Sequence, residues 1–317
     1  MQTLHSSIMR TSPPLPPYVL VSPVHNEAAD IEKTLTSVAA QTVRPLRWVI
    51  VDDGSTDTTA EIVQRFVDRH DWIGMVRLPR HDSRSFGSKV RSFNAGFERV
   101  KDLPYEVIGN VDGDISFDAD HLEFLLQKFQ ADPTLGVAGT VFRERDGYRS
   151  DVNSFEGAKH VAGQCQLFRR ECYEQIGGFL STPHGGVDWI AVVTARMRGW
   201  KTRSFREKYF FHHRPLGTAQ RSAVASAYSY GQKDYFVGGS PVWELMRVAF
   251  RATRKPYLVA GFALGCGFYG CYLRGARRTV SDEFMAFHRS EQMAKLKAVC
   301  ASVFRLRTID PFTVAGE

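Results

Sequence analysis

The sequence predicts an α/β protein with a doubly wound, mainly parallel sheet. Apolar runs typical of buried strands alternate with segments whose apolar residues recur at helical spacing. Two of these strands end in acidic loops, Val51–Asp57 and Asp112–Asp114. Ligands of open α/β sheets bind outside the carboxyl ends of the strands, so the two loops are expected to converge on one ligand.

Strands and helices are expected to alternate from residue 18 to residue 131. The first strand is followed by a helix in which Ile31, Leu35 and Val38 fall on one face. The branched and aromatic run Trp48–Val51, closed by Asp-Asp-Gly, is typical of a strand that ends in a loop. The expected strands are 18–22, 46–51, 73–78, 105–111, 135–141 and 208–211, and the expected helices are 30–41, 58–68, 88–101, 119–131 and 187–199.

Three parts of the chain are distinguished by composition. Residues 1–17 form a stiff proline-rich leader that is expected to lie outside the fold. Residues 18–215 carry the alternating pattern, and residues 216–317 form a basic, mainly helical extension. Residues 201–317 contain 19 Lys and Arg against 8 Asp and Glu, whereas the whole chain has a net charge of +7. Nucleic acid and anionic lipid would both be attracted by such a region.

Bulk properties are those of a globular protein, with 43% apolar and 24% charged residues in a chain of 317. The five cysteines are odd in number and lack the paired spacing of a zinc site. A reduced, cytosolic setting is the simplest account of them.

Each candidate motif also has an ordinary structural explanation. Asp-Asp-Gly-Ser is common turn chemistry, and Asp-Gly is a hairpin signal. Lys89 and Arg91 fit a solvated helix face, and Asp188 fits a helix cap. The functional interpretation is favoured by the order of the motifs on an alternating strand and helix background.

Four motifs in order carry a resemblance to a known family. They are Pro23-Val24-His25-Asn26-Glu27, Val51 to Asp57, Asp112-Gly113-Asp114, and Arg169-Arg170 with Ile176-Gly177-Gly178-Phe179. Over about residues 18 to 215 the chain resembles glycosyltransferase family 2. The resemblance implies the A-type glycosyltransferase fold, a nucleotide-diphosphate sugar donor, a divalent metal and inversion at the anomeric carbon. It divides the domain into a nucleotide half, about 18–115, and an acceptor half, about 116–215.

The acidic motifs suit a sugar diphosphate and a metal ion. Magnesium or manganese takes oxygen ligands, which Asp112 and Asp114 supply, and offsets the repulsion between carboxylates and diphosphate. Residues i and i+2 of an extended segment point the same way, so the two share one ion or divide metal and ribose between them. By resemblance, the residues that bind the donor nucleotide are Pro23, Glu27, Asp52, Asp53, Asp112 and, near the phosphates, Lys89 or Arg91.

Asp188 is the candidate general base. Its segment, Gly185–Trp189, resembles the family's Glu-Asp motif at the start of a helix, except that Val187 replaces the usual Glu. A general base must be a positioned carboxylate or histidine. The expected reaction is a single in-line displacement in which Asp188 takes the acceptor proton.

A histidine pair follows the last expected strand. Either His212 or His213 is expected to be a third metal ligand, and Arg214 to bind the diphosphate bidentately. The alternative is a pair of half-buried histidines at a strand end.

Residues 257–273 carry no charge and are flanked by basic residues on both sides. The run is short for a membrane span and contains four glycines, so an interfacial helix that contacts the membrane through 251–278 is expected. The alternative is a helical hairpin packed on the catalytic domain. Gly265–Gly270 matches a dinucleotide motif but follows no clean strand, so it is interpreted as glycine-rich packing. A further helix is expected at 282–304.

The sequence therefore predicts a metal-dependent inverting glycosyltransferase, peripheral at the cytoplasmic face of a membrane, with a lipid-linked or surface-polysaccharide precursor as acceptor. The donor is expected to be a UDP-, GDP- or dTDP-sugar, and nucleic acid is not an expected partner. The Gln-x-x-Arg-Trp motif of processive synthases is absent, so addition of a single sugar is expected. Two alternatives stay open, a sugar nucleotidyltransferase and a catalytically silent basic protein that binds lipid or nucleic acid.

Overall fold

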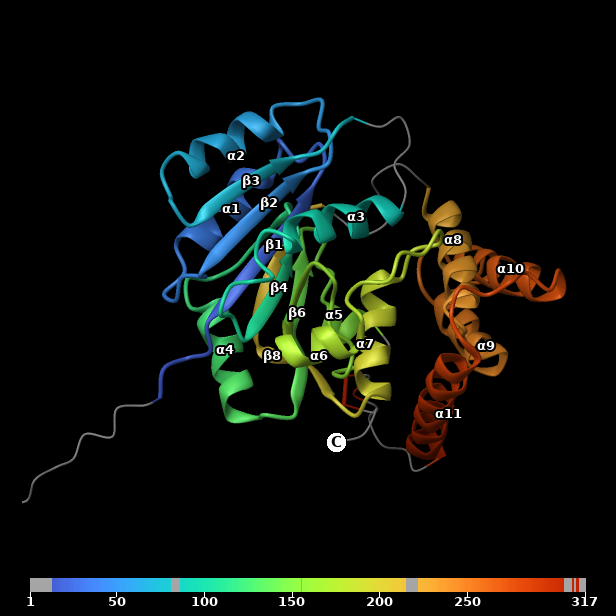
Figure 1. Cartoon of the computed structure of the whole chain (residues 1–317). Helices are drawn as coiled ribbons and strands as arrows, with labels where there is room; N and C mark the ends of the chain where they lie inside the picture. The colour runs from blue at the N-terminus through green and yellow to red at the C-terminus, as the bar shows by residue number, and fades with distance from the viewer. Residues whose placement is uncertain are drawn as a thin grey trace, which may run out of the picture.

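The computed structural model describes residues 13–80, 86–154, 156–214, 222–304, 310, 312 and 313. In these residues an eight-stranded sheet has the order β3-β2-β1-β4-β7-β6-β8-β5 (Figure 1). The strands are β1 (Tyr18–Val24), β2 (Arg47–Asp52), β3 (Ile73–Arg77), β4 (Val107–Val111), β5 (Ile115–Ser116), β6 (Leu135–Glu144), β7 (Cys165–Arg169) and β8 (Lys201–His212). The helices of the same domain are α1 (Ile31–Ala39), α2 (Thr59–Val67), α3 (Phe86–Phe97), α4 (His121–Ala131), α5 (Ser150–Asn153), α6 (Arg170–Gln175) and α7 (Val187–Met197).

The predicted parallel sheet is found in the first half of the domain. β3, β2, β1 and β4 run parallel to one another, and Val24 at the end of β1 pairs with Asp52 at the end of β2. The second half is mixed, because β7 runs antiparallel to both β4 and β6. The sequence pattern did not predict β7, and it predicted only the end of β8. The expected mainly parallel sheet is confirmed, with β7 as an antiparallel strand between its two halves and β5 antiparallel to β8 at one edge.

Alternation of side chains along the strands builds two apolar layers. Leu20 and Ile50 face one cluster with side chains of α1, α2 and α4, whereas Val21 and Val51 face another with α3, α6 and α7. Successive residues of a strand point to opposite faces, so both faces of a doubly wound sheet are apolar. Helices therefore cover both faces, and the loops at the strand ends are left for a site.

The end of the leader lies against the domain. The Gln130 amide nitrogen donates to the carbonyls of Pro13 and Pro14 at 3.0 and 2.9 Å, and the Pro17 carbonyl accepts from the Glu106 backbone at 2.8 Å. The fold thus begins earlier than the expected residue 18. Residues 1–12 and the expected boundary at 215 and 216 lie outside the described residues.

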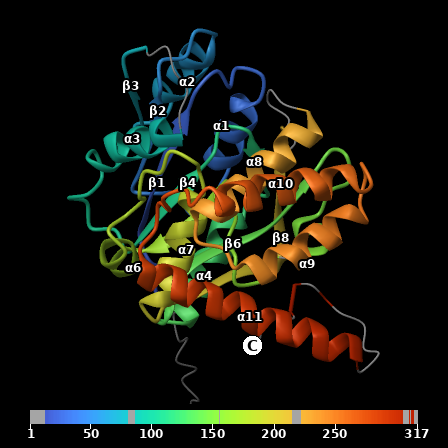
Figure 2. The ribbon, with the colours of Figure 1, turned by 90° about the vertical axis from the view of Figure 1, so that its right-hand side faces the viewer.

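Four helices follow the domain and gather on one side of it (Figures 1 and 2). They are α8 (Ala223–Phe236), α9 (Pro241–Ala252), α10 (Val259–Leu273) and α11 (Asp282–Phe304). α11 is tied to α7 by an ion pair of 2.7 Å between Glu291 and Arg196. Glycines bring α10 and α8 close, since a Cβ at Gly267 would lie 2.1 Å from the Tyr228 carbonyl oxygen. The interpretation of Gly265–Gly270 as packing is confirmed.

One face of α10 is packed and another is exposed. Phe268 is buried against α8, whereas Leu258, Phe262 and Leu273 are 73%, 74% and 84% exposed. Among the described residues, no helix is both long and apolar enough to cross a membrane. The packed face agrees with the alternative of a helical hairpin on the catalytic domain, and the expected membrane contact of the exposed face stays a prediction.

Candidate active site

The carboxyl ends of β2, β1 and β4 lie next to one another and carry the acidic loops (Figure 1). Asp52 is fully buried; one carboxylate oxygen accepts from the Ser55 backbone at 3.0 Å and the other lies 3.1 Å from Arg77 Nε. Asp53 follows it and lies 3.0 Å from Arg91 Nη2. Pro23, on β1, pairs with Val51 on β2 and so lies beside these two carboxylates. Sheet pairing thus brings together Pro23, Asp52 and Asp53, whose role in nucleotide binding stays a prediction.

Asp112 follows β4 and is bound by Lys89 from α3. The Lys89 Nζ lies 2.7 and 2.9 Å from the two Asp112 oxygens, so Lys89 does not lie on a purely solvated helix face. Asn110, which the sequence did not single out, donates to the same carboxylate at 3.0 Å. Burial raises the pKa of Asp112, and Lys89 opposes that shift.

Asp114 lies in a buried chain of alternating charges. Its Oδ2 is 2.8 Å from Arg214 Nη2, and the same Arg214 nitrogen lies 2.7 Å from Glu27 Oε1. Burial opposes ionisation, but His212 and Arg214 hold the pKa of Asp114 below its ordinary value. Burial and the negative charge of Asp114 raise the pKa of Glu27 to about 7, although Arg214 opposes this.

The two histidines have different surroundings. His212 lies between two carboxylates, with Nε2 3.5 Å from Asp114 Oδ2 and Nδ1 3.0 Å from Glu144 Oε1. Burial favours neutral His212, but the two carboxylates outweigh it and raise the pKa of His212 to about 9. His213 is 2.9 Å from the Ser116 hydroxyl. His213 contacts the acidic motif through its backbone, which donates to the Asp114 carbonyl at 2.8 Å, whereas His212 approaches the Asp114 carboxylate with its ring.

Gly113, between the two aspartates, is required by close packing. A Cβ there would lie 3.0 Å from Val24 Cγ1 and 3.3 Å from Glu27 Cγ. A side chain would therefore push apart the acidic motif and the wall formed by Glu27.

Asp188 occupies the first turn of α7, which begins after Gly186 in the left-handed conformation. It packs tightly on the segment Gly163–Gln164, since a Cβ at Gly163 would lie 2.6 Å from Asp188 Cβ. The same segment accepts hydrogen bonds from the Asp112 backbone at 2.8 Å and from the Asn110 amide. The charge of Asp188 helps, after that of Asp112, to raise the pKa of Lys89 against the effect of burial. The candidate base is thus held beside the acidic motif.

Three residues of this arrangement have no signal in the sequence. Asn110, Glu144 and Gly163 act through contacts between distant segments, such as the β6–β8 pairing that places Glu144 opposite His212. One rule could have found Asn110: residues i and i+2 of a strand point to the same face, and Asn110 lies two residues before Asp112.

The metal site expected from the sequence consists of Asp112, Asp114 and a histidine. Among the described residues, no group of three or more His, Cys, Asp or Glu side chains is arranged to hold a metal ion. The three-ligand set expected from Asp112, Asp114 and a histidine is therefore not assembled, because Lys89 and Arg214 hold the two carboxylates and His212 faces carboxylates with both nitrogens. Magnesium and related ions are often bound by one or two carboxylates together with substrate phosphate. Asp112 and Asp114 fit an ion of that kind, which is completed by its substrate.

A model of the family described as glycosyl transferase family 2 matches residues 19–177, half of the chain. The chain belongs to glycosyl transferase family 2. The match contains both acidic loops of this family 2 protein and ends just after α6.

Curated relatives match a shorter stretch of this family 2 protein. The poly-beta-1,6-N-acetyl-D-glucosamine synthase of Staphylococcus aureus (strain COL) is 30% identical over 113 residues, which is 36% of this chain and 25% of that synthase. The synthase of Staphylococcus epidermidis matches to the same extent. The matched stretch thus spans a quarter of the length of these relatives.

Solved structures with the same fold match nearly the whole chain. The mannosyltransferase PcManGT from Pyrobaculum calidifontis, in complex with GDP-Man and Mn2+, has a TM-score of 0.56 and 21% identity, and the match covers 96% of this chain and 86% of that one. TarS 1-349 of S. aureus in complex with UDP-GlcNAc has a TM-score of 0.51 and 14% identity, with coverage of 94% and 90%. At these identities the likeness shows the fold that family 2 predicted.

Proposed function

We propose that this protein is a metal-dependent, inverting glycosyltransferase that moves one sugar from a nucleotide-diphosphate donor to an acceptor hydroxyl. The observation that carries the proposal is the gathering of Asp112, Asp114 and Asp188 around one lysine, Lys89, beside the neighbouring strand end that carries Asp52 and Asp53. Strand ends of an α/β sheet are where nucleotides bind, and a carboxylate beside them supplies the base that transfer to a hydroxyl needs.

In the proposed reaction, the sugar donor binds to the first half of the domain. Asp52 and Asp53 hold base and ribose, with Pro23 and Glu27 as the facing wall. Lys89, Arg91 and Arg214 are the cations beside the site, and each is paired with a carboxylate in the free protein. A diphosphate would take over part of these contacts, with Arg214 suited to two parallel hydrogen bonds.

The transfer step is one displacement. The acceptor oxygen forms a bond to the anomeric carbon as the bond from that carbon to the diphosphate oxygen breaks, so the configuration inverts. Asp188 accepts the proton of the acceptor hydroxyl, and the nucleoside diphosphate leaves. A divalent ion at Asp112 and Asp114, manganese or magnesium, would stabilise the negative charge of the diphosphate. The Mn2+ in the PcManGT complex supports that choice of ion.

In the proposed reaction, the C-terminal helices bring the protein to its acceptor. We assign residues 251–278 to contact with the cytoplasmic face of a membrane, because exposed apolar side chains of α10 lie between clusters of arginines and a lysine. A lipid-linked or surface-polysaccharide precursor is then the acceptor that such a surface presents. Absence of the Gln-x-x-Arg-Trp motif supports a single addition.

The experiment is calorimetric titration of UDP, GDP and dTDP into the full chain, with and without manganese, repeated on Asp114→Ala. We expect one nucleotide to bind in a manganese-dependent manner and this binding to be lost in the variant. Glu98→Ala is the matched control, since Glu98 is a carboxylate on the chain surface paired only with Lys101. Absence of binding by all three nucleotides would contradict the donor site and favour a silent basic protein.

A further inference from the structure

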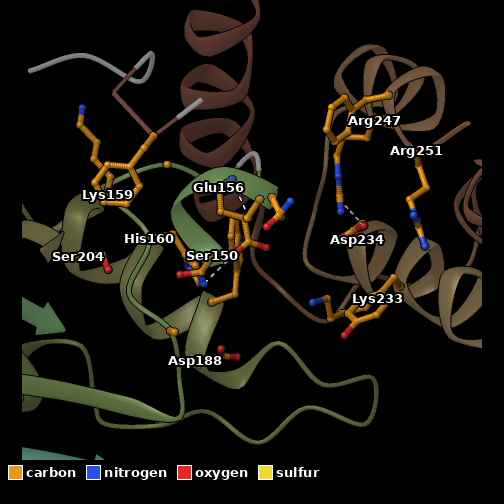
Figure 3. A pocket seen from close by; sticks show the side chains of 18 of the residues that line it. Ser150, Glu156, Lys159, His160, Asp188, Ser204, Lys233, Asp234, Arg247 and Arg251 are labelled. Atoms are coloured by element: carbon orange, nitrogen blue, oxygen red, sulfur yellow. Dashed lines mark hydrogen bonds and ion pairs between the residues drawn. The ribbon is translucent and has the colours of Figure 1, made fainter. Parts of the chain in front are cut away.

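A large cavity lies beside the candidate site, between the catalytic domain and the C-terminal helices (Figure 3). Its volume is about 1060 Å³, and Asp188 and the segment Gly163–Gln164 are part of its wall. The Gln164 carbonyl accepts from the Asp112 backbone at 2.8 Å, so the cavity adjoins the acidic motif. Pockets of 300 to 1,000 Å³ are typical of small-molecule sites, so this one has room for more than a single sugar.

Several cations that line the cavity form no ion pair with a described carboxylate. Arg247 is bound by Asp234 and Glu244, but Lys233 on α8 and Arg251 on α9 form no ion pair with any described residue. Burial opposes a charge on Lys233, yet Asp234, Glu156 and other neighbours raise its pKa, so it is charged at neutral pH. Figure 3 shows Lys233 and Asp188 on different elements of the wall, and Asp188 is among the charges that raise the pKa of Lys233. The Lys233 and Arg251 side chains are both half-buried, and a cation that is partly withdrawn from water without a carboxylate partner suits an anionic ligand.

The outer end of the cavity is both basic and apolar. Arg254 and Lys255 line it and are exposed, and Tyr257 and Leu258 follow them along the chain at 59% and 73% exposure. Aromatic side chains line the cavity as well, among them Trp189, Tyr230, Trp243 and Phe250. The lining thus combines aromatic rings and cations, and exposed apolar residues adjoin it. Such a combination suits an amphiphile with an anionic group between a polar head and an apolar chain.

We infer that this cavity is the acceptor site and that the acceptor is a sugar joined through phosphate to a lipid. The sugar lies by the aromatic side chains with its hydroxyl at Asp188, the phosphate binds Lys233 and Arg251, and the lipid chain leaves past Tyr257 and Leu258. This inference rests on the proposed transferase function, which defines Asp188 as the base.

The test uses farnesyl phosphate as the probe, with farnesol and inorganic phosphate as partial probes, titrated into the full chain by calorimetry. We expect farnesyl phosphate to bind at least about tenfold more tightly than either partial probe, because only it supplies both charge and chain. Lys233→Met should weaken its binding by about tenfold, and Arg251→Gln independently by a similar factor. Lys201→Met, which removes an equal charge from an exposed pair with Asp132, should leave it unchanged.

Titration of nucleotide into the same preparations distinguishes failure of the cavity inference from failure of the transferase proposal. Equal binding of farnesol, equal binding of inorganic phosphate, or unchanged binding by both cavity variants would overturn the inference while nucleotide binding persists. Loss of nucleotide binding in the wild type would instead remove the transferase proposal. Retained nucleotide binding by Lys233→Met shows that the variant is folded, so its loss of farnesyl phosphate binding supports the cavity assignment.

Discussion

Four carboxylates at the sheet edge each lie against a separate cationic side chain. The pairs are Asp52 with Arg77, Asp53 with Arg91, Asp112 with Lys89, and Asp114 with Arg214. Buried carboxylates without partners would raise their pKa values and lose charge. The cations therefore offset the negative charge of these carboxylates before any donor arrives. They are also the groups that phosphate would attract, so donor binding is an exchange of anionic partners.

At the same scale, the position of Asp188 depends on the absence of a side chain at residue 163. A Cβ at Gly163 would lie 2.6 Å from Asp188 Cβ and 2.7 Å from its Oδ2, so Gly163→Ala should displace the base. We expect the rate of nucleoside diphosphate release from the donor, with water as acceptor, to fall about 100-fold, while nucleotide affinity is kept. In an Asp188→Asn background the same change should have little further effect.

The control for this substitution is Gly270→Ala, which adds the same methyl group where its nearest neighbour is Arg274 Nη2 at 3.6 Å. Its rate should equal that of the wild type. An additive effect of Gly163→Ala on Asp188→Asn would show that Gly163 acts through something other than the base.

At the scale of elements, the sequence predicts helices and strands that have a local apolar period. It misses strands whose position depends on pairing with distant strands. The helix around Leu35 and the strand Trp48–Val51 were found because burial imposes a period on them. β7 was missed because its place is set by pairing with β4 and β6, which are distant in the sequence. The acidic site residues were predictable because they follow strands.

The junction of α8 and α9 contains a charge that is predicted to respond to pH. Glu244 on α9 is 1% exposed, and burial raises its pKa to about 7 from 4.5 although Arg247 opposes the shift. The folded state therefore binds more protons than the unfolded state between these values, and the free energy of unfolding falls as pH rises through them. We expect Glu244→Gln to remove roughly 1–3 kcal/mol of this fall.

The measurement is the urea midpoint of both proteins at pH 5 and pH 8. Glu98→Gln, at an exposed ion pair with Lys101, should retain the wild-type difference. A Glu244→Gln protein with the same pH dependence as the wild type would show that Glu244 ionises normally in the fold.

At the scale of the whole molecule, the C-terminal helices combine an excess of positive charge with exposed apolar side chains. Residues 201–317 carry an excess of 11 positive charges, and residues 1–200 an excess of four negative ones. The helices of the basic part lie together on one side (Figure 2). Their exposed apolar residues include Leu245, Leu258, Phe262 and Leu273. A surface that combines these properties suits an anionic membrane, where charge attracts and apolar residues insert.

The prediction at this scale is binding of the full chain to sedimented vesicles that contain anionic lipid. We expect binding that weakens with salt, because part of it is electrostatic, and that is greatly reduced by Phe262→Glu, because a charge replaces a side chain that is 74% exposed on α10. Leu46→Glu makes the same kind of change at an exposed apolar residue of the nucleotide half and should bind as the wild type does.

Equal loss in both variants would point to net charge alone, and equal binding by all three proteins would place the membrane contact outside α10. Neutral vesicles should bind more weakly than anionic ones, since the basic residues that flank α10 then have no opposite charge to meet.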